Sequence, residues 1–225
     1  MPRAVLILPL LLLLTASACG GDEGDGSAAG TTTGTTTTAP SAPGCKRVDA
    51  PKARGEGDET APTEPLDAGT TYAIVFTTNC GSFTVTLDVK SAPKTSASLV
   101  ALARSGFYDD TIFHRIVPGF VIQGGDPTQT GSGGPGYTTV DPPPPSTTYT
   151  LGTVAMAKTQ AEPAGSSGSQ FFVVTTADAG LPAEYAAVGR VTKGLDTVDR
   201  IGGLGNALEQ PTQTVLIEQA TVTES

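Results

Sequence analysis

The sequence predicts a mainly β fold, a closed antiparallel β-barrel accompanied by two α-helices. Many short runs of branched and aromatic residues, typical of strands, occupy the second two-thirds of the chain. Only two stretches there place apolar residues at helical spacing. Glycine- and proline-rich turn signals separate these segments, as expected where short strands follow one another closely.

The first 19 residues predict a bacterial lipoprotein signal peptide. Arg3 gives a positive start, and residues 5–14 form an apolar stretch that is short for a bilayer span. Residues 16–19 read ASAC and resemble a lipobox, in which Cys19 is lipidated and becomes the new N-terminus. The alternative is an ordinary secretory signal cleaved near Ala18. Both predict export, and the lipobox places the protein on the outer face of a bacterial cytoplasmic membrane.

Residues 20–67 predict a disordered tether between the lipid and the domain. Residues 20–43 consist mainly of Gly, Thr, Ser, Pro and acids with almost no apolar side chains. Such a segment cannot bury enough surface to offset its ordering entropy. Residues 44–67 are rich in proline and charge, and a disulfide at Cys45 would pin them.

Export would place Cys45 and Cys80 in an oxidising compartment, and they form an even pair once Cys19 is lipidated. A disulfide between them would close a loop of about 35 residues and stabilise the fold by ~3–4 kcal/mol in the chain-entropy description. The alternative is two independent thiols. Two cysteines and one histidine do not make a metal site, so we expect no metal.

The domain, residues 68–225, begins with a predicted hairpin. Residues 72–77 are rich in branched and aromatic side chains, and residues 79–81 form a turn signal. Apolar residues from Phe83 to Leu87 then alternate with polar ones, which is the period of a half-buried strand.

Two helices are predicted in the domain. The first starts near Pro93, which a first helical turn tolerates, and ends at Gly106. The second spans residues 194–201 and ends at the two glycines that follow. The remaining predicted strands are residues 113–116, 120–123, 153–156, 171–175, 187–191 and 214–221.

A long loop is predicted over residues 124–145, which are dense in glycine and proline. It does not predict a phosphate site, because such a glycine-rich loop needs a helix after it and the prolines here prevent one.

Two motifs in the domain point to chemistry. Residues 113–127 read FHRIVPGFVIQGGDP, and residues 168–172 read GSQFF. Together they bring one guanidinium, two glutamines and several aromatic rings, with no metal cluster and no nucleophile–base pair. A fixed guanidinium beside an apolar aromatic floor suits a prolyl peptide.

These motifs resemble the cyclophilin family of peptidyl-prolyl cis-trans isomerases, and the likeness runs over residues 72–222. The resemblance implies an eight-stranded barrel capped by a helix at each end. It also implies an enzyme without a cofactor that accelerates rotation about Xaa–Pro bonds, here in exported proteins.

By position in the family pattern, Arg115 is the catalytic donor and Gln123 holds both Arg115 and the substrate backbone. The residues that the pattern assigns to substrate binding are Phe120, Val121, Ala157, Lys158, Gln170, Phe172, Leu181 and Tyr185. Taken alone, Arg115 reads as a surface ion-pair residue, and Phe120 and Phe172 read as barrel core. Phe113 and Phe171 are expected in the core, and the single histidine, His114, is expected to be structural or to adjoin the groove.

The chemistry explains why an arginine is needed. Amide resonance sets a barrier of roughly 18–20 kcal/mol to rotation about the peptide bond. In the twisted transition state the proline nitrogen regains its lone pair, and a donor aimed at it stabilises that state more than either ground state. Arg115 is always charged and presents several rigid donors.

Two other functions remain open at this point. One is a non-catalytic peptide-binding or chaperone module on the same fold, and the other is an adhesin that uses the barrel as a scaffold. Arg115 favours the enzyme, because peptide binding alone does not require that donor. The expected partners are proline-containing polypeptides and, through Cys19, the membrane. The net charge of −9 argues against nucleic acid, and we expect a monomer.

Overall fold

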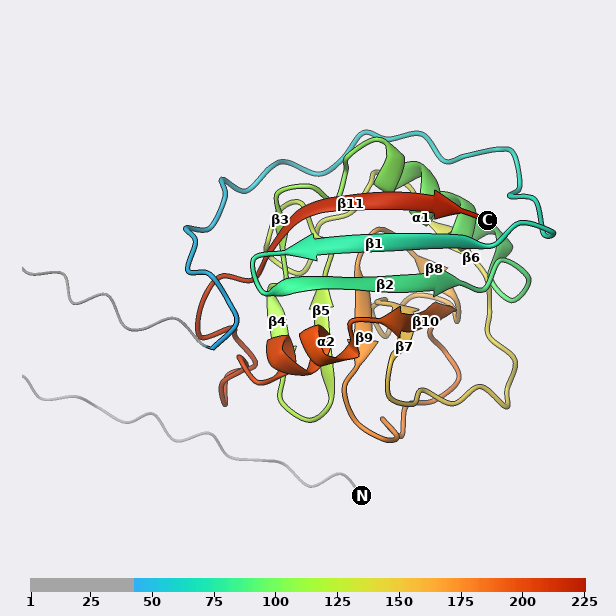
Figure 1. Ribbon diagram of the computed structural model, residues 1–225. Helices are drawn as coiled ribbons and strands as arrows, with labels where there is room; N and C mark the ends of the chain where they lie inside the picture. The colour runs from blue at the N-terminus through green and yellow to red at the C-terminus, as the bar shows by residue number, and fades with distance from the viewer. Residues whose placement is uncertain (1–42) are drawn as a thin grey trace, which may run out of the picture. The chain divides into compact units, whose positions relative to one another are not determined.

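The computed structural model describes residues 43–225, and within them a nine-stranded antiparallel sheet curls around the main core (Figure 1). The strands of this sheet run in the order β3-β11-β1-β2-β10-β7-β9-β5-β4, and a separate pair joins β6 to β8. The strands are β1 (Tyr72–Thr78), β2 (Gly81–Leu87), β3 (Thr111–Ile112), β4 (Arg115–Val117), β5 (Val121–Gly124), β6 (Thr139–Val140), β7 (Thr153–Met156), β8 (Ser166–Ser167), β9 (Phe171–Val174), β10 (Ala187–Lys193) and β11 (Leu216–Glu224).

The predicted hairpin is present as β1 and β2, and it borders the core. Ile74 and Phe76 are buried while Val75 between them is partly exposed, which is the alternation that gives a strand one apolar face. Phe76 stacks on Phe83 of β2 with ring centroids 5.2 Å apart and meets Phe171 of β9 at 4.9 Å. Phe113 and Phe171 both lie in this core, as the sequence suggested.

The sheet curls, but its pairing does not show the closed eight-stranded barrel expected from the sequence. Its two edge strands, β3 and β4, are neighbours in the chain and are separated only by Phe113 and His114. The predicted strand over residues 113–116 is therefore wrong at its start. Phe113 is fully buried, and its N–H donates to the carbonyl of Val215 at 2.9 Å, so at this residue the chain still bonds to the segment before β11, and its pairing with β5 begins only at Arg115.

Both predicted helices are present, as α1 (Pro93–Arg104) and α2 (Leu195–Gly202). The N-terminus of α1 is capped by a residue distant in the sequence, because the carboxylate of Asp141 accepts the Thr95 N–H at 2.7 Å. Gly194, before α2, has φ +77°, and a Cβ there would lie 2.3 Å from the Ser82 carbonyl oxygen. Only glycine fits this junction between β10 and α2.

The long loop after β5 contains one element that the sequence did not predict. Within it, β6 pairs with β8, which lies further along the chain. Each of the two strands has only two residues, too few to give a periodic pattern in the sequence. The pairing fixes the end of the glycine-rich segment, residues 131–138, against the segment that precedes β9.

Residues 45–59, called the strap from here on, run along the outside of the domain instead of hanging free (Figure 1). A disulfide joins Cys45 to Cys80, and the Lys46 N–H donates to the Asn79 carbonyl at 2.8 Å. The sequence placed this segment in a tether that ends at residue 67. It has no core of its own, and the disulfide together with backbone and side-chain hydrogen bonds to the domain fixes its position.

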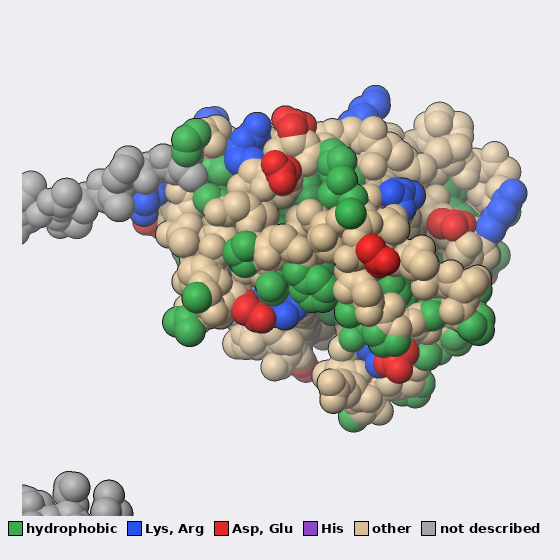
Figure 2. All heavy atoms as spheres, turned by 90° about the horizontal axis from the view of Figure 1, so that it is seen from below, with side chains coloured by type: hydrophobic (Ala, Val, Ile, Leu, Met, Phe, Trp, Pro, Cys, Tyr) green, Lys and Arg blue, Asp and Glu red, His purple; other side chains and the backbone are tan. Residues whose placement is uncertain are grey.

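No helix within residues 43–225 is long and apolar enough to cross a membrane. The predicted signal peptide, the lipidation site Cys19 and residues 20–42 of the predicted tether lie outside the described residues. On the face of the described domain that Figure 2 shows, acidic and basic side chains lie interspersed.

Candidate active site

The sheet places the predicted catalytic side chains in one row. Arg115 on β4 is directly opposite Gln123 on β5, and Gln123 is directly opposite Phe172 on β9. Directly opposite residues point to the same face of a sheet, so the register alone brings the guanidinium, the amide and the ring together.

Nine of the ten predicted site residues line one small cavity of about 130 Å³. They are Arg115, Phe120, Val121, Gln123, Ala157, Lys158, Phe172, Leu181 and Tyr185. The tenth, Gln170, lies next to this cavity and accepts a hydrogen bond from the Gln123 side chain at 3.0 Å.

The apolar wall of the small cavity is a second hydrophobic cluster, separate from the main core. Phe172 is 5% exposed and meets Tyr185 edge-on, with ring centroids 5.5 Å apart. The Tyr149 hydroxyl donates to the Tyr185 carbonyl at 2.6 Å and accepts the Tyr185 N–H at 3.0 Å. Phe172 is thus both core and cavity wall, whereas Phe120 is only half-buried.

A chain of side-chain hydrogen bonds crosses the rim of the cavity. Arg115 donates through Nε to Glu209 at 2.7 Å and through a terminal nitrogen to Gln123 at 3.2 Å. Gln170, which accepts from Gln123, donates in turn to the Gly133 carbonyl at 2.9 Å. The guanidinium is therefore held from two sides and remains partly exposed to the cavity.

Glu209 is the residue at this site that sequence reasoning missed. It lies 94 residues after Arg115, in a turn between α2 and β11 where φ at Glu209 is +62°. The Asn206 side chain builds the turn by accepting the N–H groups of Leu208 and Gln210 at 2.8 and 3.0 Å. An asparagine in a turn is a signal for local structure, but nothing in it points to Arg115.

The positive charge of Lys158 is balanced by the groups around its ammonium. Its side chain is 2% exposed, and its nitrogen lies 3.2 Å from the Glu184 carboxylate and 5.4 Å from the centre of the Tyr185 ring. It also donates to the carbonyls of Thr159 and Glu162. Lys158 therefore fixes the shape of the wall and presents no free charge to the cavity.

His114 adjoins the site without taking part in its hydrogen-bond chain. Among the described residues, neither of its ring nitrogens has a hydrogen-bond partner. Burial lowers the pKa of His114; the charge of Arg115 lowers it further and that of Asp126 opposes the change. A neutral, unbonded imidazole of this kind suits a packing role beside the groove, as the sequence suggested.

Asp126 organises the start of the glycine-rich loop. Its carboxylate accepts the N–H groups of Thr128 and Gly131 at 2.7 and 2.6 Å. Burial raises the pKa of Asp126, but the hydrogen bonds from Thr128, Gly133 and Gly131 outweigh it and lower the pKa overall. The ionised carboxylate thus holds this loop in place.

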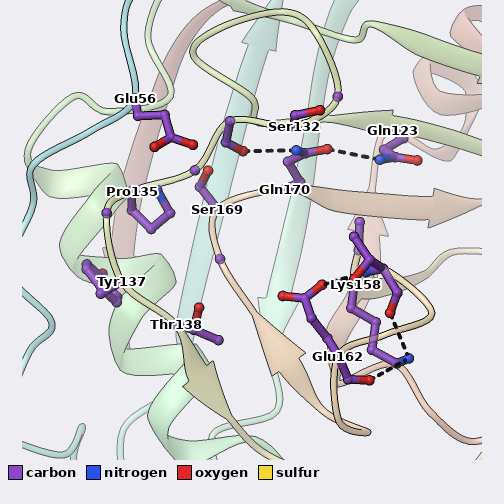
Figure 3. Close-up of a pocket in the computed structure, with 17 residues that line it drawn as sticks. Glu56, Gln123, Ser132, Pro135, Tyr137, Thr138, Lys158, Glu162, Ser169 and Gln170 are labelled. Atoms are coloured by element: carbon purple, nitrogen blue, oxygen red, sulfur yellow. Dashed lines mark hydrogen bonds between the residues drawn. The ribbon is translucent and has the colours of Figure 1, made fainter.

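A larger cavity of about 470 Å³ adjoins the small one (Figure 3). The two share Gln123, Ala157 and Lys158 as a common border. The rest of the larger cavity is lined by the glycine-rich segment 131–138, by Thr159 and Glu162, by residues 168–170 and by Glu56 of the strap. Within the part of the chain that the structure describes, no group of three His, Cys, Asp or Glu side chains could hold a metal ion.

Comparison with known proteins assigns a family. Residues 73–222 match the family described as cyclophilin type peptidyl-prolyl cis-trans isomerase/CLD. The Peptidyl-prolyl cis-trans isomerase-like 1 of Gibberella zeae is 40% identical over 159 residues, which cover 68% of this chain and 96% of that protein. The protein of the same name from Bos taurus is 37% identical over 161 residues, covering 69% and 95%.

Solved structures show the same likeness. The crystal structure of a cyclophilin type peptidyl-prolyl cis-trans isomerase from Cryptosporidium parvum has a TM-score of 0.63 at 30% identity, covering 68% of this chain and 98% of that one. A second crystal structure of that protein, in the presence of the dipeptide Ala-Pro, gives a TM-score of 0.62 at 31% identity, covering 67% and 98%. These relatives are all eukaryotic. The strap lies outside the residues that match the family.

Proposed function

We propose a function from one premise: the chain belongs to the cyclophilin-type peptidyl-prolyl cis-trans isomerase family. The protein is a peptidyl-prolyl isomerase that accelerates rotation about Xaa–Pro bonds. The observation that supports this most strongly is the guanidinium of Arg115, held at the rim of a small apolar cavity by two neighbouring side chains.

The small cavity receives the proline ring. Phe120, Phe172 and Leu181 give it an apolar wall, and the ring of a proline substrate carries no donor that would need a partner there. The residue before proline then lies over Ala157 and Lys158, which border the cavity. This places the bond that rotates near Arg115 and Gln123.

Arg115 stabilises the twisted transition state. A guanidinium has five N–H donors, and here Glu209 and Gln123 accept from two of them. The remaining donors are available to the proline nitrogen, whose lone pair is exposed only when amide resonance is broken. The interaction is therefore stronger in the transition state than in either planar ground state, which is what lowers the barrier.

Glu209 and Gln123 act through Arg115. Together they hold the planar guanidinium in one orientation, so little reorganisation is needed when the substrate bond twists. Rotation breaks no covalent bond, and the mechanism needs no general acid or base. His114 has no role in it.

The test is isomerisation of a short Xaa–Pro peptide by the purified full-length chain. We expect turnover by the wild type and a loss of roughly 10²-fold or more in Arg115→Ala, the scale of removing one electrostatic donor. Arg104→Ala is the matched control, because Arg104 is a surface arginine paired with Glu224 outside both cavities. Near-wild-type turnover by Arg115→Ala would contradict the mechanism. Peptide binding without any turnover would favour the peptide-binding module instead.

We also propose that the protein is an exported bacterial lipoprotein, anchored through Cys19 on the outer face of the cytoplasmic membrane. The support is the pattern of residues 1–19, together with a Cys45–Cys80 disulfide that suits an oxidising compartment. Mass spectrometry of the protein from membranes should find a lipidated N-terminus at Cys19, and Cys19→Ser should abolish it. A chain that retains Met1 would contradict this proposal.

A further inference from the structure

One wall of the larger cavity comes from outside the part of the chain that matches the family. Glu56, on the strap, lines this cavity, whereas the family match begins at residue 73. Figure 3 shows Glu56 at the strap end of the cavity, with Lys158 and Glu162 at the opposite end. Family membership therefore assigns no role to this carboxylate.

The strap is fixed on both sides of Glu56. Three of its backbone N–H groups donate at 2.9 Å to carbonyls of the loop that forms the cavity: Arg54 to Pro127, Gly57 to Gly134 and Glu59 to Pro135. The Arg54 side chain also donates to the Phe107 carbonyl. Glu56 is thus held between two anchored positions.

Close packing leaves the strap no room to slide. A Cβ at Gly57 would lie 2.8 Å from the Phe107 ring and 3.0 Å from Pro135, so the backbone touches the domain directly. Gly136 has φ +93°, and a Cβ there would lie 2.5 Å from the Gly57 carbonyl oxygen. Glycine on both sides lets the two segments meet, and this sets where Glu56 stands.

The charge at this wall is negative and uncompensated. Glu56 is exposed and has no hydrogen bond or ion pair within the described residues. Lys158 is the one cation among the described residues that line the cavity, and it is already paired with Glu184. Glu162 adds a second carboxylate, which accepts from the backbone and hydroxyl of Thr159.

The position of the larger cavity relative to the substrate follows from the shared border. The proline ring fills the small cavity, and the residue before it lies over Ala157 and Lys158, which both cavities share. Residues further toward the N-terminus of the substrate then reach the larger cavity.

We propose that the larger cavity selects substrates with a lysine or arginine two or three residues before the isomerised proline, and that Glu56 is the group that selects them. The inference rests on the proposed function and names a substrate class for it. A cavity of about 470 Å³ has room for the long side chain of a lysine or arginine. The cationic end of that side chain pairs with the Glu56 carboxylate, which has no other partner among the described residues.

The probes are acetylated peptides that differ only at the second, or only at the third, position before proline, which is lysine, alanine or glutamate. On the full-length chain we expect kcat/KM for the lysine peptide to exceed that for alanine by about two- to fivefold, the size of an exposed ion pair. Glutamate should fall below alanine. Added salt should reduce the difference, because it screens exposed charges.

Variants assign the preference to one residue. Glu56→Gln should remove it, and Glu56→Lys should reverse the order of the lysine and glutamate peptides. Glu59→Gln is the matched control: it makes the same charge change three residues along the strap, outside the cavity lining, and should keep the wild-type order. Thermal unfolding of each variant checks that the strap remains folded.

The outcomes separate this inference from the proposed function. Equal turnover of the three peptides at both positions, or a lysine preference that survives in Glu56→Gln, would overturn the role of Glu56 while isomerase activity stands. Absence of turnover on every peptide, alanine included, would instead overturn the proposed function.

Discussion

The two cavities share a border but are built differently. The small cavity takes Arg115, Gln123 and Phe172 from three neighbouring strands, where the sheet register fixes their relation. The larger cavity is lined by a glycine-rich loop and by the strap, which have almost no regular structure. A disulfide and a few backbone hydrogen bonds hold the strap in place.

The difference indicates that the two cavities have different roles. Groups that act on the transition state need fixed geometry, and a strand row beside a packed cluster supplies it. Groups that distinguish one substrate from another can lie on loops, which vary without disturbing the strands beneath them. We therefore infer that the small cavity determines the rate of isomerisation and the larger one the choice of substrate.

The largest expected effect comes from releasing the strap. Replacing both Cys45 and Cys80 by alanine should lower the free energy of unfolding by ~3–4 kcal/mol, since the disulfide closes a loop of 35 residues and limits the unfolded chain. Urea unfolding measures this change. The folded variant should still isomerise an alanine peptide, because no strap residue lines the small cavity.

The same variant can break the comparison. If it keeps the stability of the wild type, the disulfide does not secure the strap. If it stays folded but loses turnover of the alanine peptide, the strap contributes to the small cavity and the two regions are not separable.

A smaller effect is expected at Glu209, and it tests whether this residue raises the rate by holding Arg115. Glu209→Ala should lower kcat by roughly two- to fivefold with little change in KM, because Arg115 loses one of its two supports in an exposed ion pair. Glu209→Gln, which keeps an acceptor, should fall between the wild type and the alanine variant. Glu224→Gln, which alters the other exposed Arg–Glu pair, is the control and should leave kcat unchanged. An unchanged kcat in Glu209→Ala would remove Glu209 from the mechanism.

The smallest effect concerns His114, which lies beside both Arg115 and the loop of the larger cavity. Burial lowers its pKa from the ordinary value of 6.5, so between the folded and unfolded pKa values the unfolded chain binds more protons than the folded one. The free energy of unfolding should therefore fall as the pH decreases below 6.5.

This pH dependence can be assigned to His114, because it is the only histidine in the chain. Asp126 has a lowered pKa, so the stability that its charge contributes is lost only below its ordinary value of 3.8. Urea unfolding of His114→Gln between pH 5 and about 6.5 should show a weaker slope than the wild type. An equal slope in the two proteins would show that the imidazole is not buried as described.

The regions differ also in how far the sequence could predict them. The strand over residues 153–156 and both helices follow from periodicity and turn signals, and the structure has them. The small cavity was predictable because Arg115, Phe120, Val121, Gln123 and Phe172 lie in two specific motifs, and the family pattern gave the positions of its other residues. Register then brings these motifs together without further information.

The larger cavity was not predictable in the same way. Glu56 lies in a polar, proline-rich segment whose composition indicates a tether, and only contacts with a loop some 80 residues away give it a fixed position. Glu209 was missed for a similar reason, because an aperiodic turn places it beside Arg115. Such long-range pairings between irregular segments leave no local pattern.

One measurement tests the different roles of the two cavities directly. It is kcat/KM for the lysine and alanine peptides, measured for the wild type, Arg115→Ala and Glu56→Lys. We expect Arg115→Ala to slow the turnover of both peptides by the same factor, roughly 10²-fold, and to keep their ratio. We expect Glu56→Lys to change the ratio in favour of alanine. A ratio that changes in Arg115→Ala but stays the same in Glu56→Lys would contradict these roles.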